Sequence, residues 1–512
     1  GIRDKLVTGV QTCALPIFNN AGALFNSSST AATYAGLVTL GAATSIVAGT
    51  GRITLSNTGT ITGAGFGLTL GGSAGGTVTS IIGTGAGTLT KLDSGTWTLS
   101  GVNTYTGTTT LNAGVIKAGS ARALGSTSVI TVNANAALDL NGQTMTSTGA
   151  ITLNGTGISG GGALLNSAST ASTFAGAVTI GSDSSIISSS NVAGGITLSS
   201  TVNNANALTL GGSASSTISG VISSSGSVIK LGSGTWTLSA ANTYTGGTTI
   251  SLGTLKMGNA TAAGTGGISV SSGGALDLNG QAMTSTGLLI LNGTGVSSTG
   301  ALTNSSSGAA TYAGALMLSG SSSIIAASGN ISLSSTSAVI GNGLGVTLGG
   351  AGNGSFYGVL ATGSGTLSKT GAGSWFIVGS NTYSGATTIG AGTVQMSNNF
   401  ALGRSSAITL TSGATLDLNG SNALNLSTLT LAGTGTSGMA LTNSGLGATY
   451  SGAIVLSADT TIGSNVSSTL TLNSTINGGG FRLTLNGSSA SGYLNGIISN
   501  LDRKSTRLNS SH

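Results

Sequence analysis

One stretch decides the fold: GSGTWTLSAANTYTGGTTI, which runs from Gly232 to Ile250. Its tryptophan is one of only three in a chain of 512 residues, and the other two lie in near copies of the same stretch. The copies read DSGTWTLSGVNTYTGTTTL at Asp93–Leu111 and GAGSWFIVGSNTYSGATTI at Gly371–Ile389. Apolar residues occupy alternate positions in each copy, which is the period of a pleated strand with one buried face. The stretch therefore predicts β-structure.

The copies belong to a long internal repeat. Two aromatic positions recur at a spacing of 139 residues: Trp97, Trp236 and Trp375, and Tyr105, Tyr244 and Tyr383. The phrase LDLNG recurs at nearly the same spacing, from Leu138, Leu276 and Leu416. A fixed period is the sequence signature of a repeat architecture. We interpret the chain as about 3.5 copies of a unit of about 139 residues in one continuous array.

Composition restricts the fold further. Charged residues make up 4% of the chain and hydrophobic residues 38%, with 91 Gly, 1 Pro and no Glu. Helices avoid dense Gly, Ser and Thr, so a helical protein is excluded. Disorder is also excluded, because it requires low hydrophobicity together with high charge. No apolar run approaches the roughly 18 residues of a membrane helix.

Alternating runs such as SVITVNANAALDLNG, Ser128–Gly142, recur along the unit and end at Gly, Asn or Ser. An antiparallel sandwich or propeller and a parallel β-solenoid both fit this pattern. Charge depletion favours the solenoid, because equivalent side chains stack about 4.8 Å apart and like charges would repel at every step. We predict an all-β fold, a single elongated parallel β-helix with coils of roughly 20 to 24 residues.

The two ends differ from the rest in composition. Residues 1–17, GIRDKLVTGVQTCALPI, contain the only Cys and the only Pro, and residues 502–512, DRKSTRLNSSH, contain the only His. Both ends resemble translated sequencing adaptors, so we expect them to be non-native and residues 18–501 to be a β-helix fragment. Without them the formal net charge falls from +6 to +3. The remaining basic residues are scattered singly, which argues against a nucleic-acid partner.

The stretch GTLTKLDSGTWTLSGVNTYTGTTTLNAGVIKAGSARALG, Gly87–Gly125, resembles the autotransporter-associated β-strand repeat, also called the passenger-associated transport repeat. The other two tryptophan-containing stretches resemble it as well. The resemblance implies a right-handed β-helix passenger of a Gram-negative bacterium. Such a passenger is secreted or held at the cell surface, and a C-terminal outer-membrane β-barrel, which is not in this fragment, translocates it.

We interpret the motif residues as structural. The tryptophan is expected to be a buried plug at the same coil position in each unit, with Asn242 and Gly246 shaping the corner and Tyr244 capping it. The repeat motif comprises Trp97, Tyr105, Gly107, Trp236, Asn242, Tyr244, Gly246, Trp375, Tyr383 and Gly385.

The sequence gives no indication of a catalytic, cofactor or metal site. Asp139, Asp277 and Asp417 recur once per unit, and we interpret each as an outward polar residue that leads into an Asn-Gly corner. One carboxylate per unit is too sparse for the six to eight oxygens of a calcium site. Without native His, Cys or Glu, neither a catalytic triad nor a zinc site can be assembled. The chain is therefore expected not to be an enzyme.

Three functions remain open. The first is a structural or adhesive passenger, a monomer without a membrane span, that meets a host-cell or matrix surface and whose repeats assist secretion. The second is the non-catalytic part of a β-helix polysaccharide-active enzyme. The third is a Thr-rich solenoid that binds a flat lattice such as ice or crystalline polysaccharide. The third requires outward Thr-x-Thr in every coil, whereas clusters such as TTT and TTI recur once per unit, and a structure without Thr stacked on consecutive coils would exclude it.

Overall fold

The computed structural model describes residues 22–145, 149–284, 287–424, 427–465, 468–487 and 492–502. The predictions for residues 1–17 and 502–512 lie outside this part of the chain, apart from Asp502. The chain divides into two units, Gly1–Thr248 and Thr249–His512. Within the described ranges both units consist of β-strands, with no α-helix and only two 3-10 turns, η1 (Ile158–Gly160) and η2 (Val296–Ser298).

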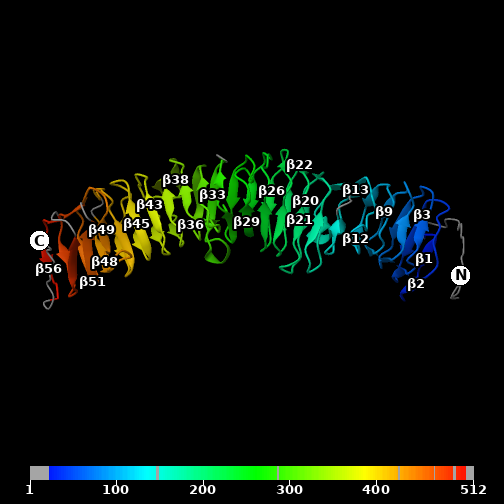
Figure 1. Ribbon diagram of the computed structural model, residues 1–512, viewed down its shortest axis with the longest axis horizontal. Coiled ribbons are helices and arrows are strands. Elements are labelled where there is room, and N and C mark those ends of the chain that lie inside the picture. The colour runs from blue at the N-terminus through cyan, green and yellow to red at the C-terminus, as the bar shows by residue number, and fades with distance from the viewer. Residues whose placement is uncertain are drawn as a thin grey trace. The chain divides into compact units, whose positions relative to one another are not determined.

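The parallel strands of unit 1 are stacked in three columns, and Figure 1 shows the strands of successive coils side by side. Column 1 contains β1 (Leu24–Asn26), β3 (Thr44–Ala48), β6 (Leu68–Gly71), β9 (Leu89–Lys91), β11 (Thr109–Leu111), β13 (Val129–Val132), β16 (Ala150–Leu153), β19 (Val178–Ile180), β22 (Val202–Asn204) and β25 (Ile222–Ser223). Column 2 contains β2 (Ala32–Tyr34), β4 (Ile53–Leu55), β7 (Gly76–Val78), β10 (Thr96–Leu99), β12 (Gly114–Ala118), β14 (Ala136–Asp139), β17 (Leu164–Leu165), β20 (Ser184–Ile187), β23 (Leu208–Gly211) and β26 (Val228–Lys230). Column 3 contains β15 (Thr144–Met145), β18 (Ser172–Phe174), β21 (Ile196–Leu198), β24 (Ser216–Ile218) and β27 (Thr235–Leu238), and β5 (Thr60–Thr62) pairs with β8 (Ile81–Gly83) separately.

Unit 2 repeats the arrangement with parallel strands throughout. One stack contains β30 (Ile268–Val270), β33 (Leu289–Gly293), β36 (Leu316–Ile325), β38 (Ala338–Ile340) and β41 (Val359–Ala361). A second contains β29 (Gly253–Met257), β31 (Gly274–Asp277), β34 (Leu302–Thr303), β36 again, β39 (Val346–Gly349), β42 (Leu367–Lys369), β44 (Thr387–Ile389), β46 (Ile408–Leu410), β48 (Leu429–Gly433), β51 (Ile454–Ser464), β53 (Ile476–Asn477) and β56 (Ile498–Ser499). A third contains β32 (Ala282–Met283), β35 (Ala310–Tyr312), β37 (Ile331–Leu333), β40 (Gly354–Phe356), β43 (Ser374–Ile377), β45 (Gly392–Met396), β47 (Ala414–Asp417), β49 (Leu441–Asn443), β51 again and β54 (Leu483–Gly487), and β50 (Gly447–Tyr450), β52 (Thr469–Leu472) and β55 (Tyr493–Leu494) pair with one another.

The alternation seen in the sequence sets which side chains face inward. On β10 the pattern is half-buried Thr96, buried Trp97, half-buried Thr98 and buried Leu99. Equivalent residues of successive coils lie opposite one another, so Leu, Ile and Val form apolar ladders inside the coil, which a few buried polar residues interrupt. Thr and Ser form the ladders on the outside. The predicted all-β parallel solenoid is confirmed.

Candidate functional site

The three tryptophans lie inside the coils, on β10, β27 and β43, and all three are fully buried. Each indole Nε1 donates a hydrogen bond to a backbone carbonyl of the preceding coil. The donors Trp97, Trp236 and Trp375 reach Gly71 O at 3.0 Å, Gly211 O at 3.0 Å and Gly349 O at 3.2 Å. The predicted burial of the tryptophans is confirmed, and each indole also ties two coils together.

Small residues make room for the indoles. Trp97 pairs with Gly76 on β7, where an added Cβ would lie 2.8 Å from the indole ring. Trp375 pairs with Gly354 on β40, where an added Cβ would lie 2.4 Å from the ring. In the second copy the residue opposite the indole is Ser216. A small residue therefore lies opposite the indole in all three copies.

The prediction that each tryptophan occupies the same coil position is wrong within unit 1. Trp97 belongs to column 2, between β7 and β12, whereas Trp236 belongs to column 3, after β24. The reason is that the repeat does not contain a whole number of coils. Six coils separate β9 from β25 in column 1, and the second copy begins one strand later, on β26. The tryptophan of the second copy therefore lies one column further along than that of the first.

The tyrosines, of which Tyr244 was predicted to cap the corner, are buried side chains. They lie in the core, with exposed fractions of 0%, 0% and 1% for Tyr105, Tyr244 and Tyr383. Each hydroxyl contacts the threonine four residues later, at 2.8, 2.6 and 2.7 Å for Thr109, Thr248 and Thr387. Burial raises the pKa of Tyr383 to about 12, and it raises the pKa of Tyr105 and Tyr244 as well.

The motif glycines lie where two backbones approach closely. A Cβ added at Gly107, Gly246 or Gly385 would come within 2.2, 2.4 or 2.2 Å of a carbonyl oxygen of the preceding coil. In each case this carbonyl belongs to another glycine: Gly87, Gly226 or Gly365. A side chain at any of the three motif positions would collide with this carbonyl, so glycine is required there for the close packing of the two coils.

Asn242 bridges to the preceding coil, since its Oδ1 accepts a hydrogen bond from Ile222 N at 2.8 Å. Asn103 and Asn381, which we did not single out from the sequence, behave in the same way. Their Oδ1 atoms accept from the backbone N of Ile82 and Leu360, both at 2.7 Å, and their Nδ2 atoms donate to the carbonyls of Ala123 and Ala401, both at 2.6 Å. The recurrence of Asn-Thr-Tyr was the signal that could have identified them.

Three buried lysines were missed by sequence reasoning. Lys91, Lys230 and Lys369 have exposed fractions of 0%, 0% and 1%. Their ammonium groups donate to backbone carbonyls at a corner: Lys91 to Leu92, Asp93 and Ala113 at 2.5, 2.6 and 3.0 Å, Lys230 to Leu231 and Gly232 at 3.2 and 2.6 Å, and Lys369 to Thr370, Gly371 and Ala391 at 2.7, 2.7 and 3.1 Å. The signal was present in Leu-Thr-Lys, because period 2 places Lys91 on the same inward face as Leu89.

Burial and hydrogen bonding act in opposite directions on these lysines. Desolvation lowers the pKa of Lys91, Lys230 and Lys369 to about 8, and the nearby carboxylate of Asp93 raises that of Lys91 in part. Carbonyl acceptors favour the charged ammonium. At neutral pH each lysine is therefore a cation held by carbonyl oxygens.

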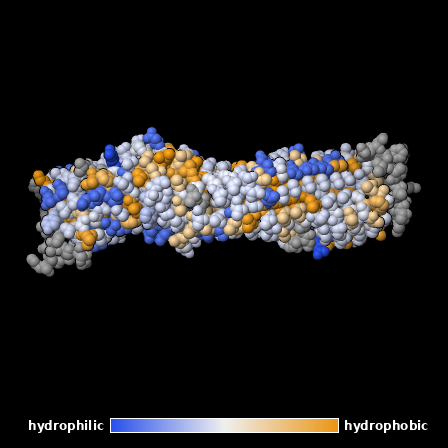
Figure 2. Space-filling view, turned by 90° about the horizontal axis from the view of Figure 1, so that it is seen from above, coloured by the Kyte–Doolittle hydropathy of each residue, from blue (hydrophilic) through white to orange (hydrophobic). Residues whose placement is uncertain are grey.

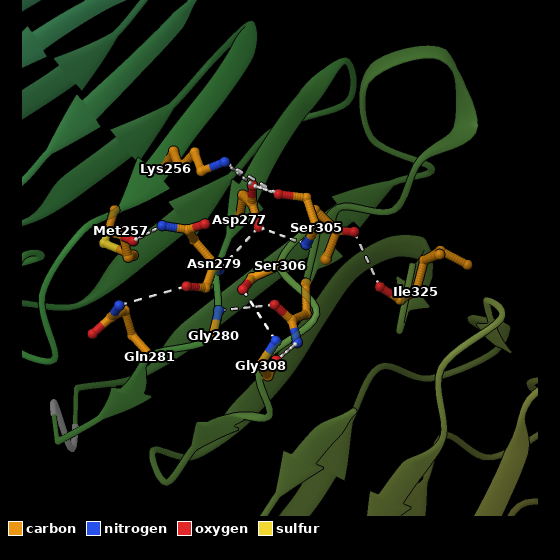
Figure 3. A network of polar contacts seen from close by, with 12 residues as sticks. Lys256, Met257, Asp277, Asn279, Gly280, Gln281, Ser305, Ser306, Gly308 and Ile325 are labelled. Carbon is orange, nitrogen blue, oxygen red and sulfur yellow. Dashed lines mark hydrogen bonds and ion pairs between the residues drawn. The ribbon is translucent and has the colours of Figure 1, made fainter. Parts of the chain in front are cut away.

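The recurring aspartates lie on the outer face of the strand, opposite half-exposed residues such as Lys256, as expected, but they are buried. Asp277 is 3% exposed, and Figure 3 shows it between Lys256, Asn279 and Ser305. Its Oδ1 accepts from Asn279 N and Ser305 N at 3.0 Å each, and its Oδ2 accepts from Ser305 Oγ at 2.5 Å. The carboxylate is buried because the next coil covers it. The predicted Asn-Gly corner follows, with positive φ angles of 48° at Asn279 and 75° at Gly280.

The other copies contain the same arrangement with one difference. Asp139 accepts from Ser167 Oγ at 2.6 Å, and Lys117 Nζ lies 3.7 Å from its Oδ2. Lys256 takes this place in the second copy, at 3.8 Å from Asp277. In the third copy Gln395 Nε2 donates to Asp417 at 3.2 Å instead. The carboxylate and serine thus recur in all three copies, while the lysine does not.

These groups connect backbone segments of neighbouring coils. Among the described residues no cluster of three or more His, Cys, Asp or Glu side chains could bind a metal ion. The carboxylates of Asp139, Asp277 and Asp417 each accept hydrogen bonds from their own corner and from the following coil. The arrangement can fix one coil against the next.

The outer face of column 1 presents a threonine ladder. Six threonines lie opposite one another on consecutive coils: Thr69, Thr90, Thr110, Thr131, Thr152 and Thr179. Two residues along the strand, Asn133 Nδ2 donates to Asn112 Oδ1 at 2.7 Å, and Asn154 Nδ2 donates to Asn133 Oδ1 at 3.4 Å. Figure 2 shows a surface of mostly intermediate hydropathy, as Thr, Ser, Gly and Ala would give.

A comparison with known families decides what the motif is. Residues 89–118, 228–257 and 367–396 each match the family model described as the passenger-associated-transport-repeat. The chain contains three passenger-associated-transport-repeats. These repeats include all the predicted motif residues, and each has its buried lysine at the third position and its buried tryptophan at the ninth.

The contacts of the passenger-associated-transport-repeats extend beyond their own residues. Trp97 and Asn103 bond to Gly71 and Ile82, which precede the first repeat, and Asn103 also bonds to Ala123, which follows it. The repeat therefore forms hydrogen bonds with the coils on both sides of it.

No curated protein and no solved structure matches the chain. In the part of the chain that the structure describes, no helix has the length and apolar character needed to cross a membrane.

Proposed function

We propose that this chain is the structural or adhesive passenger region of a Gram-negative autotransporter, and that its repeats assist translocation by folding outside the cell. The observation that supports this most is the threefold match to the passenger-associated-transport-repeat. The geometry supplies a physical reason. Each repeat anchors the neighbouring coils through buried hydrogen bonds, and coil formation releases free energy that opposes backward movement of the chain.

The proposed partners follow from this class. A C-terminal outer-membrane translocator carries the passenger to the cell surface, and a host-cell or matrix surface is its ligand. The passenger acts as a monomer and performs no catalysis. Its buried carboxylates support the latter, because they serve as hydrogen-bond acceptors for backbone and serine groups. Incubation with a panel of polysaccharides should release no reducing ends.

Secretion by cells tests the proposal. We would place the chain between a secretion signal and an outer-membrane translocator and measure protease-accessible passenger on intact cells. The triple variant Trp97→Ala, Trp236→Ala and Trp375→Ala should reduce surface display several-fold, because each truncation leaves a cavity in a repeat. Val192→Ala is the control, since Val192 is 76% exposed and lies outside the repeats. Equal display of all variants would contradict assisted translocation.

Adhesion needs a separate measurement. The purified chain should bind saturably to immobilised host-cell matrix, and the same chain unfolded in denaturant should not. Display without any saturable binding would leave a stalk function and remove the adhesive one.

A second candidate function is binding to a flat lattice, which the threonine ladder of column 1 favours. Hydroxyls repeated about every 4.8 Å over six coils match the regular spacing of a crystalline surface. Thr131→Lys should then abolish sedimentation with crystalline polysaccharide or ice, whereas Lys117→Thr should not affect it. Equal sedimentation of wild type and Thr131→Lys would dispose of this candidate.

A further inference from the structure

The apolar pattern of the coils does not by itself choose one stacking register. The inner ladder of column 1 runs through five residues that lie opposite one another: Leu70, Lys91, Leu111, Val132 and Leu153. A shift of one strand by two residues keeps every inward side chain inward, because the side-chain period is 2. Leu, Ile and Val would exchange places at little cost. Lys91 is the one member of this set whose displacement would cost substantial free energy.

The position of Lys91 is specified by the coil that follows it. Its Nζ donates to Ala113 O at 3.0 Å, and Gly114 lies against it with a φ of 70°. A Cβ at residue 114 would be 2.5 Å from this ammonium nitrogen. A two-residue shift would bring Asn112 or Ile116 to this place, and both have a Cβ. Only the native register gives the ammonium a carbonyl acceptor and a glycine together.

Unit 2 contains the same pairing. Lys369 Nζ donates to Ala391 O at 3.1 Å, and a Cβ added at Gly392 would lie 2.7 Å from it. Gly392 has a φ of 67°. Lys369 also lies within an apolar ladder, between Leu348 and Ile389.

We propose that the buried lysines of the first and third repeats, Lys91 and Lys369, set the stacking register of the next coil by requiring a glycine that can face the ammonium group. Two of the carbonyls that bind Lys91, Leu92 O and Asp93 O, belong to its own corner and are kept in any register, so the discrimination rests on Ala113 O and on the space at Gly114. A shift that places a Cβ against the buried ammonium destabilises the stacking, whereas apolar side chains treat the two registers as equal. The tryptophan and its opposing glycine do the same on another column, since a two-residue shift would place Trp97 against Val78. This role is independent of what the passenger binds.

Thiol crosslinking between β9 and β11 tests the proposal in the full chain, with Cys13→Ser as background. Thr90→Cys with Thr110→Cys reports the native register. Thr90→Cys with Asn112→Cys, or with Thr108→Cys, reports a shift by two residues. A short thiol-bridging reagent is added after refolding from denaturant. Each pair is compared in the wild-type background and in Lys91→Leu, Lys91→Met and Lys117→Met. Lys117 is the control because its side chain is 33% exposed.

Lys91→Leu and Lys91→Met should raise the yield of shifted crosslinks at least about tenfold, because a shift no longer breaks a hydrogen bond to an ammonium group. Lys117→Met should give the wild-type yield. A single native register in both Lys91 variants would overturn the proposal. Loss of folding in both would overturn it as well, since it would show that the lysine supplies stability and does not select the register.

Discussion

At the scale of single residues, the polar groups with the largest expected effect on stability lie inside the coil. The tyrosine hydroxyls, the asparagine amides and the lysine ammonium groups of the repeats are all buried and hydrogen-bonded. Burying such groups is favourable only when their partners are fixed in place. The repeats are therefore the parts of the chain in which a single substitution has the largest consequence.

The buried tyrosines predict a loss of stability at alkaline pH. The pKa of Tyr383 is about 12 in the folded chain, whereas an unfolded tyrosine titrates near 10. Below pH 10 the hydroxyl is protonated in both states, and its contribution is fully present. As the pH rises from about 10 to about 12, only the unfolded state ionises, so the free energy of unfolding falls by about 1.4 kcal/mol per pH unit for each such tyrosine.

Denaturant midpoints measured from pH 9 to 12 test this expectation. Tyr383→Phe should show a shallower fall than the wild type, because phenylalanine has no proton to lose. Thr387 keeps a partner in that variant, since its Oγ1 also contacts Ser405 Oγ at 2.5 Å. Identical pH profiles of the two proteins would refute the assignment of the alkaline transition to this tyrosine.

At the scale of elements, the turn that follows β9 and binds the Lys91 ammonium packs directly against Gly114 of the next coil. Gly114→Ala adds a methyl group 2.3 Å from Asp93 O and 2.5 Å from the Lys91 ammonium, in addition to strain at a φ of 70°. Gly85→Ala is a matched control, because Gly85 has a φ of 63° and nothing within 4 Å of an added Cβ. We expect the control to lose about 1–2 kcal/mol, the cost of a left-handed alanine.

Gly114→Ala should lose clearly more than the control, because the added methyl group would contact backbone oxygens of Asp93 and Gly95 in the turn between β9 and β10, which the two strands hold in place. Amide hydrogen exchange of β9 to β12 measures this loss locally, which suits an array whose coils do not unfold as one unit. Equal protection in the two variants would mean that the corner relaxes around the methyl group.

At the corner that begins with Asp277, the stability supplied by a buried hydrogen-bond acceptor can be measured separately from that of a partly exposed ion pair. Asp277→Ala leaves Asn279 N, Ser305 N and Ser305 Oγ without their acceptor, so we expect a loss of about 2–3 kcal/mol in the free energy of unfolding. Lys256→Gln reproduces the residue that the third copy has at this place, and we expect a loss below about 1 kcal/mol because the lysine is 32% exposed. Denaturant unfolding of both variants checks the order, and a larger loss for Lys256→Gln would reverse our interpretation.

At the scale of the whole molecule, the sequence predicts the architecture better than the position of its polar groups. Charge depletion and alternation were sufficient for a parallel solenoid, since both reflect the stacking of equivalent side chains. The tryptophan burial followed from the scarcity of other large residues. Lys91 was not predicted to be inside because a charged residue is usually solvated, and only the contacts of its ammonium group explain the exception.

Two further features could not be predicted, for a common reason. The burial of Asp277 depends on Ser305, which lies 28 residues later and meets it only through the coil stacking. The column of Trp236 depends on the exact length of every coil between it and Trp97, and these lengths differ from coil to coil. A sequence period of 139 residues does not contain that information.

The displacement of Trp236 by one column limits what two copies of a repeat can share. Within unit 1 one repeat advances the motif by one column, so a side chain that both copies inherit lies on a different face of the coil in the second copy. A surface confined to one face of this unit therefore has to be built from residues that differ between the two copies.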